Sequence, residues 1–355
     1  MATDTVNRNS LYSVDFEEEI KRWNGFFNTI NRPEDRTVHT ARQSIWKKNK
    51  ATLWHYAAVE KKYDVPIFII YSLFNRPNIL DFSPSTSVIK GLVNKGYDVY
   101  LLDWGMAEYE DKDITIEDYV ADYIKKGVQR TLRHSGAKEV SVVGYCLGGT
   151  FAAMYASIAE EPIRNLVVAT VPIDFGVAAI PASWAEGLKE GTMNLERFID
   201  TNGIIPPAHI EAMFRSVTSP VYYSPYVTLL ARSHDKRFVE KWQRMNKWTK
   251  GHVPLTGGAL RQLMNDLFNE NKLVKGEFTI HGVEADLANI KANLLVVSSK
   301  NDNLIPEEQS LPLIDLVSSH DKTYQLVDAG HVSLAISGKL SGILDDWLSE
   351  RSNSK

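Results

Sequence analysis

Strands and helices alternate along most of this chain, and no other feature limits so strongly the folds that it can adopt. Continuously apolar runs such as "PIFIIYSLF" and "EVSVV" predict strands that are buried on both faces. Between such runs, apolar residues at helical spacing predict amphipathic helices that stop at Gly96 and near Gly136. Repeated strand–helix–strand units predict an α/β protein with a mostly parallel sheet.

The alternation is interrupted once, between residues 176 and 276, by a stretch rich in Trp, Tyr, Pro and Met. Strand-like runs then return with "NLLVVSS" and "TYQLVDA". We therefore divide the chain into an N-terminal arm (1–42), a first core part (43–175), an insertion (176–276) that we interpret as a cap over one edge of the sheet, and a second core part (277–355). In the arm, apolar residues at helical spacing predict a helix that packs on its own domain or offers a docking surface to a partner. These residues are Phe16, Ile20, Trp23, Phe26 and Phe27.

Composition excludes several functional classes. The chain has 355 residues, a formal net charge of −4 and one cysteine, so a broad basic surface for nucleic acid and an internal disulfide are both excluded. The N-terminus lacks the apolar core of a signal peptide, and no apolar run reaches the roughly 20 residues of a membrane helix. We expect a cytoplasmic protein without a membrane span. The scattered histidines predict no metal site; those given no role are His55, His134, His209, His234, His252, His281 and His320.

The single cysteine, Cys146, lies in "GYCLGGT" between an expected strand and an expected helix. This G-x-C-x-G pattern has the form of the nucleophile elbow of hydrolase folds, in which a sharp strand-to-helix turn presents the nucleophile. Glycines flank it because the crowded turn leaves no room for a Cβ. The helix N-terminus favours a thiolate, and the backbone N–H of Leu147 is placed to donate to an oxyanion. The alternative for an isolated cysteine is a buried structural thiol.

Two later stretches favour the catalytic interpretation. Asp302 follows the strand "NLLVVSS" in a loop that closes with Pro306, and His331 follows a late strand in "LVDAGHVS". For each residue considered alone, there is a structural alternative: Asp302 as an aspartate that forms a turn, and His331 as a histidine in a surface loop. Together with Cys146 they give the hydrolase-fold order of nucleophile, acid and histidine. A second oxyanion donor should come from the loop after "PIFIIY", between Leu73 and Asn75, with Phe74 as our choice.

The same stretches carry a family likeness. The chain resembles the catalytic subunit of poly(3-hydroxyalkanoate) synthases, which polymerise 3-hydroxyacyl-CoA into storage polyester. The matching stretches are "YSLFNRPNILDFSPSTSVIKGLVNKGYDVYLLDWG", "IEDYVADYI", "VVGYCLGGT", "IDTNGIIP" and "DAGHVS". The likeness extends from about Ile45 to the C-terminus. It is greatest to the two-subunit Bacillus-type (class IV) enzymes, with class III as the near alternative.

This resemblance implies Cys146 as nucleophile, His331 as general base and Asp302 as the third member of the triad. It implies no cofactor, because the coenzyme A thioester, short-chain (R)-3-hydroxybutyryl-CoA in our interpretation, is the substrate. It also implies a second synthase subunit, small and PhaR-like or larger and PhaE-like, together with a growing polyester chain and a granule surface. Family members usually carry His directly after the catalytic Asp, whereas Asn303 stands there in this chain.

Two other functional classes stay open at the level of sequence. One is a cysteine-dependent hydrolase, either a thioesterase or a lactone hydrolase, and the other is a non-catalytic module of hydrolase fold. A synthase must exclude water from its acyl-enzyme, which gives the aromatic insertion a use. The aromatic residues that would cover the pocket, or simply form the core of the cap, are Trp184, Phe214, Tyr222, Tyr223, Tyr226, Trp242 and Trp248.

Overall fold

The computed structural model describes residues 16–31, 40–177, 194–218 and 224–353. These residues fall into two compact units, which we call the helical unit and the core unit. The helical unit contains α1 (Phe16–Asn31), α9 (Ser224–Arg232) and α10 (Lys236–Thr249). The other described elements belong to the core unit.

The core unit is built on an eight-stranded sheet in the order β1-β2-β4-β3-β5-β6-β11-β12. Neighbours from β4 to β12 are parallel, whereas β2 pairs antiparallel with β1 and with β4. The mostly parallel sheet predicted from the sequence is thus confirmed. The strands are β1 (Gln43–Lys48), β2 (Ala51–Tyr56), β3 (Ile67–Ile70), β4 (Val99–Asp103), β5 (Val140–Tyr145), β6 (Ile163–Ala169), β11 (Asn293–Ser299) and β12 (Lys322–Val327).

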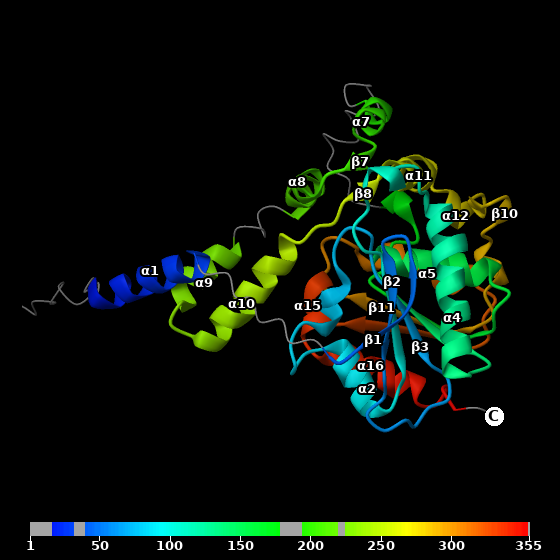
Figure 1. Ribbon diagram of the computed structural model, residues 1–355, viewed down its shortest axis with the longest axis horizontal. Coiled ribbons are helices and arrows are strands. Elements are labelled where there is room, and N and C mark those ends of the chain that lie inside the picture. Colours follow the sequence, from blue (N-terminus) through cyan, green and yellow to red (C-terminus); the bar gives the residue numbers. More distant parts are fainter. Residues whose placement is uncertain (1–15, 32–39, 178–193, 219–223, 354–355) are drawn as a thin grey trace, which may run out of the picture. The chain divides into compact units, whose positions relative to one another are not determined.

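Helices cover both faces of this sheet, since every residue of β3 and β5 is buried and successive side chains point to opposite faces. Figure 1 shows the strands at the centre of the core unit, with α2, α4, α5 and α16 around them. The elements that accompany the sheet are η2 (Pro77–Asp81), α2 (Val88–Lys95), η3 (Tyr109–Asp111), α3 (Ile116–Asp118), the π-helical η4 (Tyr119–Ile124), α4 (Lys125–Ser135), α5 (Leu147–Ile158), η7 (Leu287–Asn289), α13 (Glu307–Ser310), α14 (Pro312–Leu316), α15 (His331–Ile336) and α16 (Lys339–Leu348).

The helix boundaries agree with the stop signals in the sequence. Helix α2 starts at Ser87, whose Oγ accepts a hydrogen bond of 2.9 Å from the Lys90 N–H. It ends at Gly96, where φ is +106°. Helix α4 ends at Gly136 with φ of +71°, a left-handed conformation that glycine adopts without steric cost.

The predicted cap insertion lies between β6 and β11, and the two units divide it. Helices α9 and α10 belong to the helical unit, whereas the remaining described parts belong to the core unit, so the four-segment division of the chain stays a prediction. The elements of this stretch and its continuation in the core unit are η5 (Phe175–Val177), α7 (Leu195–Asn202), β7 (Ile204–Ile205), α8 (Pro207–Thr218), β8 (Leu255–Thr256), α11 (Gly257–Gln262), the π-helical η6 (Leu263–Asn269), α12 (Lys272–Lys275), β9 (Thr279–Ile280) and β10 (Val283–Glu284).

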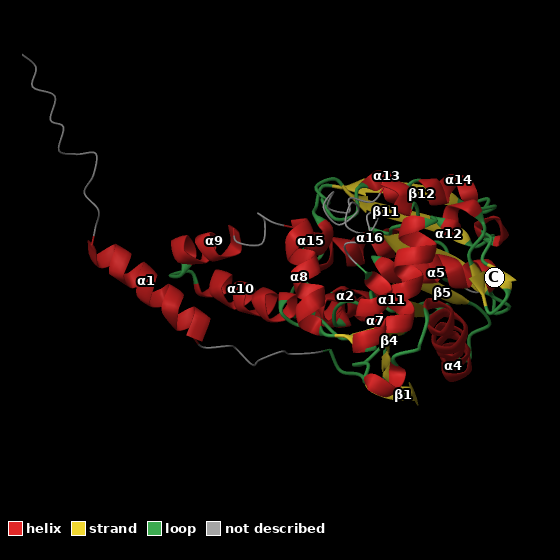
Figure 2. Ribbon diagram, turned by 90° about the horizontal axis from the view of Figure 1, so that it is seen from above, coloured by secondary structure: helices red, strands yellow, loops and turns green. Residues whose placement is uncertain are grey.

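In the helical unit, α1 lies beside α9 and α10 (Figures 1 and 2). The predicted helix over the arm is present, but the face that contacts its neighbours is not the apolar one. Gly25 approaches Ser233 closely, and the Ser233 Oγ donates a hydrogen bond of 2.8 Å to the Arg22 carbonyl. On α1 most of the large apolar side chains are exposed, among them Phe16 (77% exposed), Ile20 (57%) and Phe27 (53%), whereas Phe26 is partly buried.

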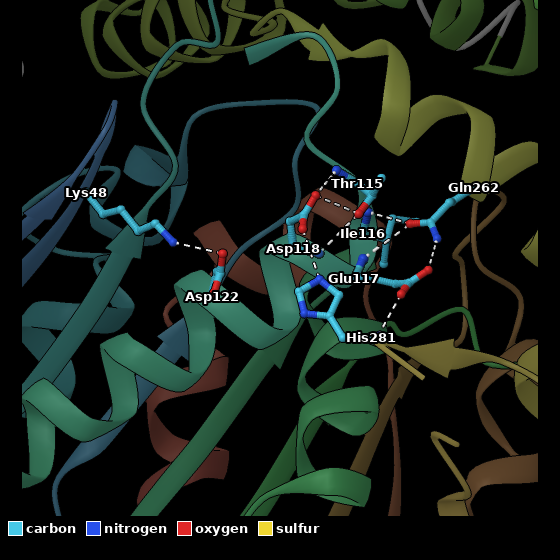
Figure 3. A network of polar contacts seen from close by, with 8 residues as sticks. All are labelled: Lys48, Thr115, Ile116, Glu117, Asp118, Asp122, Gln262 and His281. Carbon is cyan, nitrogen blue, oxygen red and sulfur yellow. Dashed lines mark hydrogen bonds and ion pairs between the residues drawn. The ribbon is translucent and has the colours of Figure 1, made fainter. Parts of the chain in front are cut away.

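A polar network ties α3 to Gln262 at the end of α11 and to His281 in the β9–β10 hairpin (Figure 3). Glu117 Oε1 accepts a hydrogen bond of 2.6 Å from Gln262 Nε2, and its Oε2 accepts one of 2.7 Å from the backbone N–H of His281. The Gln262 Oε1 in turn accepts from the Ile116 N–H at 2.7 Å. Asp118 closes the network through His281 Nε2 at 3.0 Å. The network therefore fixes the β9–β10 hairpin and the end of α11 against α3.

Within the ranges that the structure describes, no helix combines the length and the apolar character that crossing a bilayer requires.

Candidate active site

Cys146 lies on a sharp turn between β5 and α5. Its backbone has φ of +54° and ψ of −134°, a strained conformation for a residue with a side chain. The Cys146 N–H donates to the Ala169 carbonyl at 3.0 Å, and the Cys146 carbonyl accepts from the Gly149 N–H at 2.7 Å. These bonds to a neighbouring strand and to the first helical turn hold the strained residue in place. The arrangement matches the elbow expected from the sequence.

The glycines around Cys146 are required by backbone that comes close to them. A Cβ on Gly144 would lie 2.6 Å from the Gly148 carbonyl oxygen, which is closer than packed atoms come. A Cβ on Gly148 would lie 2.7 Å from the carbonyl carbon of Tyr71, just after β3. Because backbone cannot move aside as a flexible side chain can, each position tolerates only glycine. The G-x-C-x-G pattern thus places the start of α5 directly against the end of β3.

Asp302 follows β11, and both of its carboxylate oxygens are used. Oδ1 accepts hydrogen bonds from the N–H groups of Leu304 (3.0 Å) and Ile305 (2.8 Å), which shapes the turn before Pro306. Oδ2 lies 2.7 Å from Nδ1 of His331. The Asp302 side chain is fully buried, so its charge acts on the imidazole with little screening by water. The neighbouring Asn303 is exposed.

His331 begins α15, after β12, and contacts both other members of the predicted triad. Burial alone would lower the pKa of His331, but the charge of Cys146 and hydrogen bonds to Asp302 and to Cys146 raise it to about 10. Since Nδ1 faces Asp302, Nε2 is the ring nitrogen available to the sulfur. The structure therefore brings together the side chains of Cys146, Asp302 and His331, while their catalytic roles stay a prediction.

Tyr145 was not identified from the sequence. Its hydroxyl donates a hydrogen bond to the backbone carbonyl of His331, and its ring lies edge-on to the imidazole, with centroids 5.9 Å apart and planes at 75°. The same ring stacks on Tyr71 at 5.9 Å. Tyr145 therefore fixes the position of the loop that carries His331. Its place directly before the nucleophile, in the G-x-C-x-G pattern, is the sequence signal that could have identified it.

The two proposed oxyanion donors lie at the same edge of the sheet. Leu147 is the first residue of α5, where backbone N–H groups have no partner within the helix. Phe74 lies in the buried loop after β3, and β3 is the parallel neighbour of β5. The Phe74 N–H donates to Ser72 Oγ at 3.3 Å, and its carbonyl accepts from His252 and Val253. The oxyanion role of both residues stays a proposal.

The aromatic residues named for the insertion have different surroundings. Trp184, Tyr222 and Tyr223 lie outside the described residues. Phe214 on α8 packs edge-on to Phe74, with ring centroids 5.3 Å apart. Tyr226, Trp242 and Trp248 belong to the helical unit, where the Tyr226 and Trp242 rings pack against each other. Phe214 thus contacts the predicted oxyanion loop.

Comparisons with known proteins agree with this architecture. Residues 65–336 match the model of the alpha/beta hydrolase fold family. A monoacylglycerol lipase from Paleococcus ferrophilus has a similar structure, with a TM-score of 0.52 at 14% identity over 84% of this chain and 99% of that one. At such low identity the likeness bears on the fold alone.

Relatives in sequence identify the family more narrowly than the comparison of folds does. A protein of Haloferax mediterranei named "Poly(3-hydroxyalkanoate) polymerase subunit PhaC" is 34% identical over 88% of this chain, which spans 64% of that relative's length. A protein of the same name from Allochromatium vinosum is 30% identical over 92% of this chain and 93% of its own length.

Proposed function

Because the chain belongs to the α/β-hydrolase fold and to the family of poly(3-hydroxyalkanoate) polymerase PhaC subunits, we propose that it polymerises (R)-3-hydroxyacyl-CoA with release of coenzyme A. The observation that carries the proposal is the contact of His331 with both Cys146 and Asp302 in a chain of this family. Cys146 is the nucleophile, His331 the proton carrier, and Asp302 the residue that orients the imidazole. The substrate we infer is short-chain, 3-hydroxybutyryl-CoA.

The first step transfers the acyl group to Cys146. The Cys146 proton passes to His331, and the thiolate sulfur attacks the thioester carbonyl. The oxyanion accepts hydrogen bonds from backbone N–H groups, and we assign Leu147 and Phe74 to this role. The tetrahedral intermediate then collapses, the bond to the coenzyme A sulfur breaks, and the leaving thiolate takes a proton from His331.

The second step extends the chain. His331 accepts the proton of a 3-hydroxyl group, and the hydroxyl oxygen attacks the acyl carbonyl on Cys146. An ester bond forms, and the carbon–sulfur bond to Cys146 breaks. The thiolate that leaves is the nucleophile for the next round, and the proton on His331 again lies beside it. No external oxidant or reductant is needed.

Sulfur suits this reaction better than oxygen does. Exchange of one thioester for another is close to thermoneutral, so the acyl group on Cys146 remains activated for ester formation. A serine would hold the acyl group as an oxyester and would lose that driving force before elongation. Since a simple esterase has no such requirement, a cysteine in the elbow favours acyl transfer to a hydroxyl.

We further propose that a second synthase subunit assists the reaction and that polymer growth retains the enzyme at a granule surface. The exposed apolar face of α1, which includes Phe16, Ile20 and Phe27, supports an interaction of this kind. The cap role of residues 176–276, which would exclude water from the acyl-enzyme, is part of the same proposal.

The products of one incubation test the proposed function. Purified protein is mixed with 3-hydroxybutyryl-CoA, alone and together with co-expressed candidate partner subunits, and the products are separated. Insoluble polyester with free coenzyme A is the expected result. Free 3-hydroxybutyrate with coenzyme A would identify a hydrolase instead, and no release of coenzyme A with any partner would contradict catalysis altogether.

A further inference from the structure

His252, a histidine without an assigned role in the sequence, holds the loop that follows β3. Its Nδ1 lies 3.2 Å from the Phe74 carbonyl oxygen, and the N–H of Val253 donates to the same oxygen at 3.2 Å. Asn75 and His252 also form an isolated antiparallel bridge. Residues 252–253, which follow α10 in sequence and belong to the core unit, therefore act as a short strap on this loop.

An aromatic contact fixes the orientation of the His252 ring. The imidazole stacks on Phe214 with centroids 5.4 Å apart and planes at 6°, and Phe214 in turn packs edge-on to Phe74. Burial lowers the pKa of His252, although the hydrogen bond to Phe74 opposes this shift. A carbonyl oxygen only accepts hydrogen bonds, so the imidazole carries its proton on Nδ1 and donates it to Phe74.

The loop held in this way adjoins the nucleophile elbow. The backbone of Ile70 and Tyr71 touches Gly148 in the first turn of α5, and Leu73 and Asn75 are buried. A peptide unit is planar, so fixing the Phe74 carbonyl also fixes the direction of the Asn75 N–H, which points the opposite way. The strap therefore sets the direction of the Asn75 N–H, and by anchoring residue 74 it also limits the movement of the neighbouring Phe74 N–H. Both N–H groups lie in the loop that must supply an oxyanion donor.

We propose that His252 is a positioning residue for acyl transfer, because it holds the loop from Leu73 to Asn75 so that a backbone N–H of this loop meets the oxyanion. The inference rests on the proposed function and adds a residue from the predicted cap insertion to the acylation step. It assigns His252 no contact with the substrate and no proton transfer.

The test uses three variants of the full chain. In His252→Asn, the amide nitrogen falls near the position of Nδ1 and keeps the bond to Phe74. In His252→Gln, the amide nitrogen falls near the position of Nε2, so the hydrogen bond to Phe74 is lost. The side chain is still an amide, as in the Asn variant, so the two variants differ in the position of the donor. His252→Leu removes the donor and keeps apolar volume against Phe214.

Two reactions of Cys146 are compared in each variant. Alkylation by iodoacetamide needs the thiolate but forms no oxyanion, whereas acylation by 3-hydroxybutyryl-CoA or by p-nitrophenyl butyrate needs both. Removing one oxyanion donor outright costs about 100-fold or more, so a displaced loop should slow acylation by at least about tenfold. We expect this loss in His252→Gln and His252→Leu, with alkylation within about twofold of the parent, and near-parental acylation in His252→Asn.

Parental acylation in the Gln and Leu variants overturns the proposal, and so does a parallel loss of alkylation and acylation. The proposal is also overturned if the Asn variant is acylated as slowly as the Gln variant. If the His252→Leu substitution prevents folding, the Asn and Gln pair still decides. Should the parent react with p-nitrophenyl butyrate but release no coenzyme A, the proposed function fails while the test of His252 remains valid with the ester.

Discussion

Nδ1 of His331 lies 2.7 Å from Oδ2 of Asp302, across the ends of the neighbouring parallel strands β12 and β11. The Asp302 carboxylate also accepts two backbone hydrogen bonds in its own turn. Because the carboxylate is held on both sides, the imidazole is held in one orientation, with its other nitrogen available to Cys146.

Replacing Asp302 by Asn should slow polymer formation by at least about 100-fold, because the imidazole loses its orienting charge. Deprotonating a 3-hydroxyl group requires a more basic imidazole than deprotonating a thiol does. The rate of elongation should therefore fall more than the rate of acylation. Coenzyme A release in a single turnover measures acylation, and polymer yield measures elongation. Asp315→Asn, at an exposed carboxylate on α14, is the matched control. Elongation at the parental rate in the Asp302 variant would be inconsistent with this role.

Tyr145→Phe removes the hydroxyl that holds the His331 carbonyl but keeps the ring. A single hydrogen bond contributes about 0.5–1.5 kcal/mol, so acylation should fall by up to about tenfold. Tyr155→Phe is the control, since the Tyr155 hydroxyl bonds to Glu161 at 2.6 Å toward the far end of α5. Both variants should lose similar thermal stability, and only Tyr145→Phe should lose activity. Equal activity of the two variants would show that the Tyr145 hydroxyl does not contribute to positioning His331.

Gly148→Ala should disrupt the elbow, because the added Cβ meets the backbone that follows β3. Overpacking of this kind typically costs about 1–3 kcal/mol and shifts backbone. We expect a lower melting temperature together with loss of Cys146 alkylation by iodoacetamide. The control is Gly342→Ala in α16, where a Cβ meets no atom within 4 Å. That variant should be as stable as the parent or more so, since alanine favours a helix.

The protonation of His331 should depend on Cys146. The charge of Cys146 helps to raise the pKa of His331 to about 10, so the imidazolium persists in mildly alkaline solution. In Cys146→Ala that support is lost, and the pKa should fall toward the ordinary value of about 6.5. At about pH 8 the ring is then charged in the parent and neutral in the variant. Nuclear magnetic resonance of labelled histidine measures both titrations, and identical curves would show that the two side chains do not interact.

The network around Glu117 should contribute to stability rather than to catalysis. Glu117→Gln places an amide donor where one carboxylate oxygen accepts from Gln262 or from the His281 N–H. Leaving a partly buried donor without an acceptor costs about 1–3 kcal/mol. Urea unfolding should show this loss, whereas Glu277→Gln at an exposed position should show none. A stable Glu117 variant would mean that the hairpin is held by other contacts.

The sequence was sufficient to predict the sheet and the proximity of Cys146, Asp302 and His331, because both leave local signals. Strands buried on both faces are continuously apolar, as "NLLVVSS" is for β11. Cys146 and Asp302 each follow such a strand, whereas His331 follows the edge strand β12, which is less buried. Their order along the chain predicts that the three residues meet at one edge of the sheet. β1, with the sequence "QSIWKK", was missed because it lies at the edge of the sheet and is only partly buried.

Tyr145 and His252 could not be assigned roles for a different reason. Each acts on a backbone carbonyl far away in sequence, of His331 and Phe74 respectively. A carbonyl group is present at every residue, so no residue type or spacing marks it as a target. The packing face of α1 was also not predictable, since the contact at Gly25 depends on Ser233 in another part of the chain.

The most direct test of the account is the identity of the acylated residue. Protein mixed with 3-hydroxybutyryl-CoA is quenched in acid, digested and examined by mass spectrometry, in parallel with Cys146→Ala. We expect a hydroxyacyl adduct on the peptide that contains Cys146, removed by hydroxylamine as a thioester is, and no adduct in the variant. Polymer formation by Cys146→Ala, or an acyl group carried by a different side chain, would contradict the mechanism.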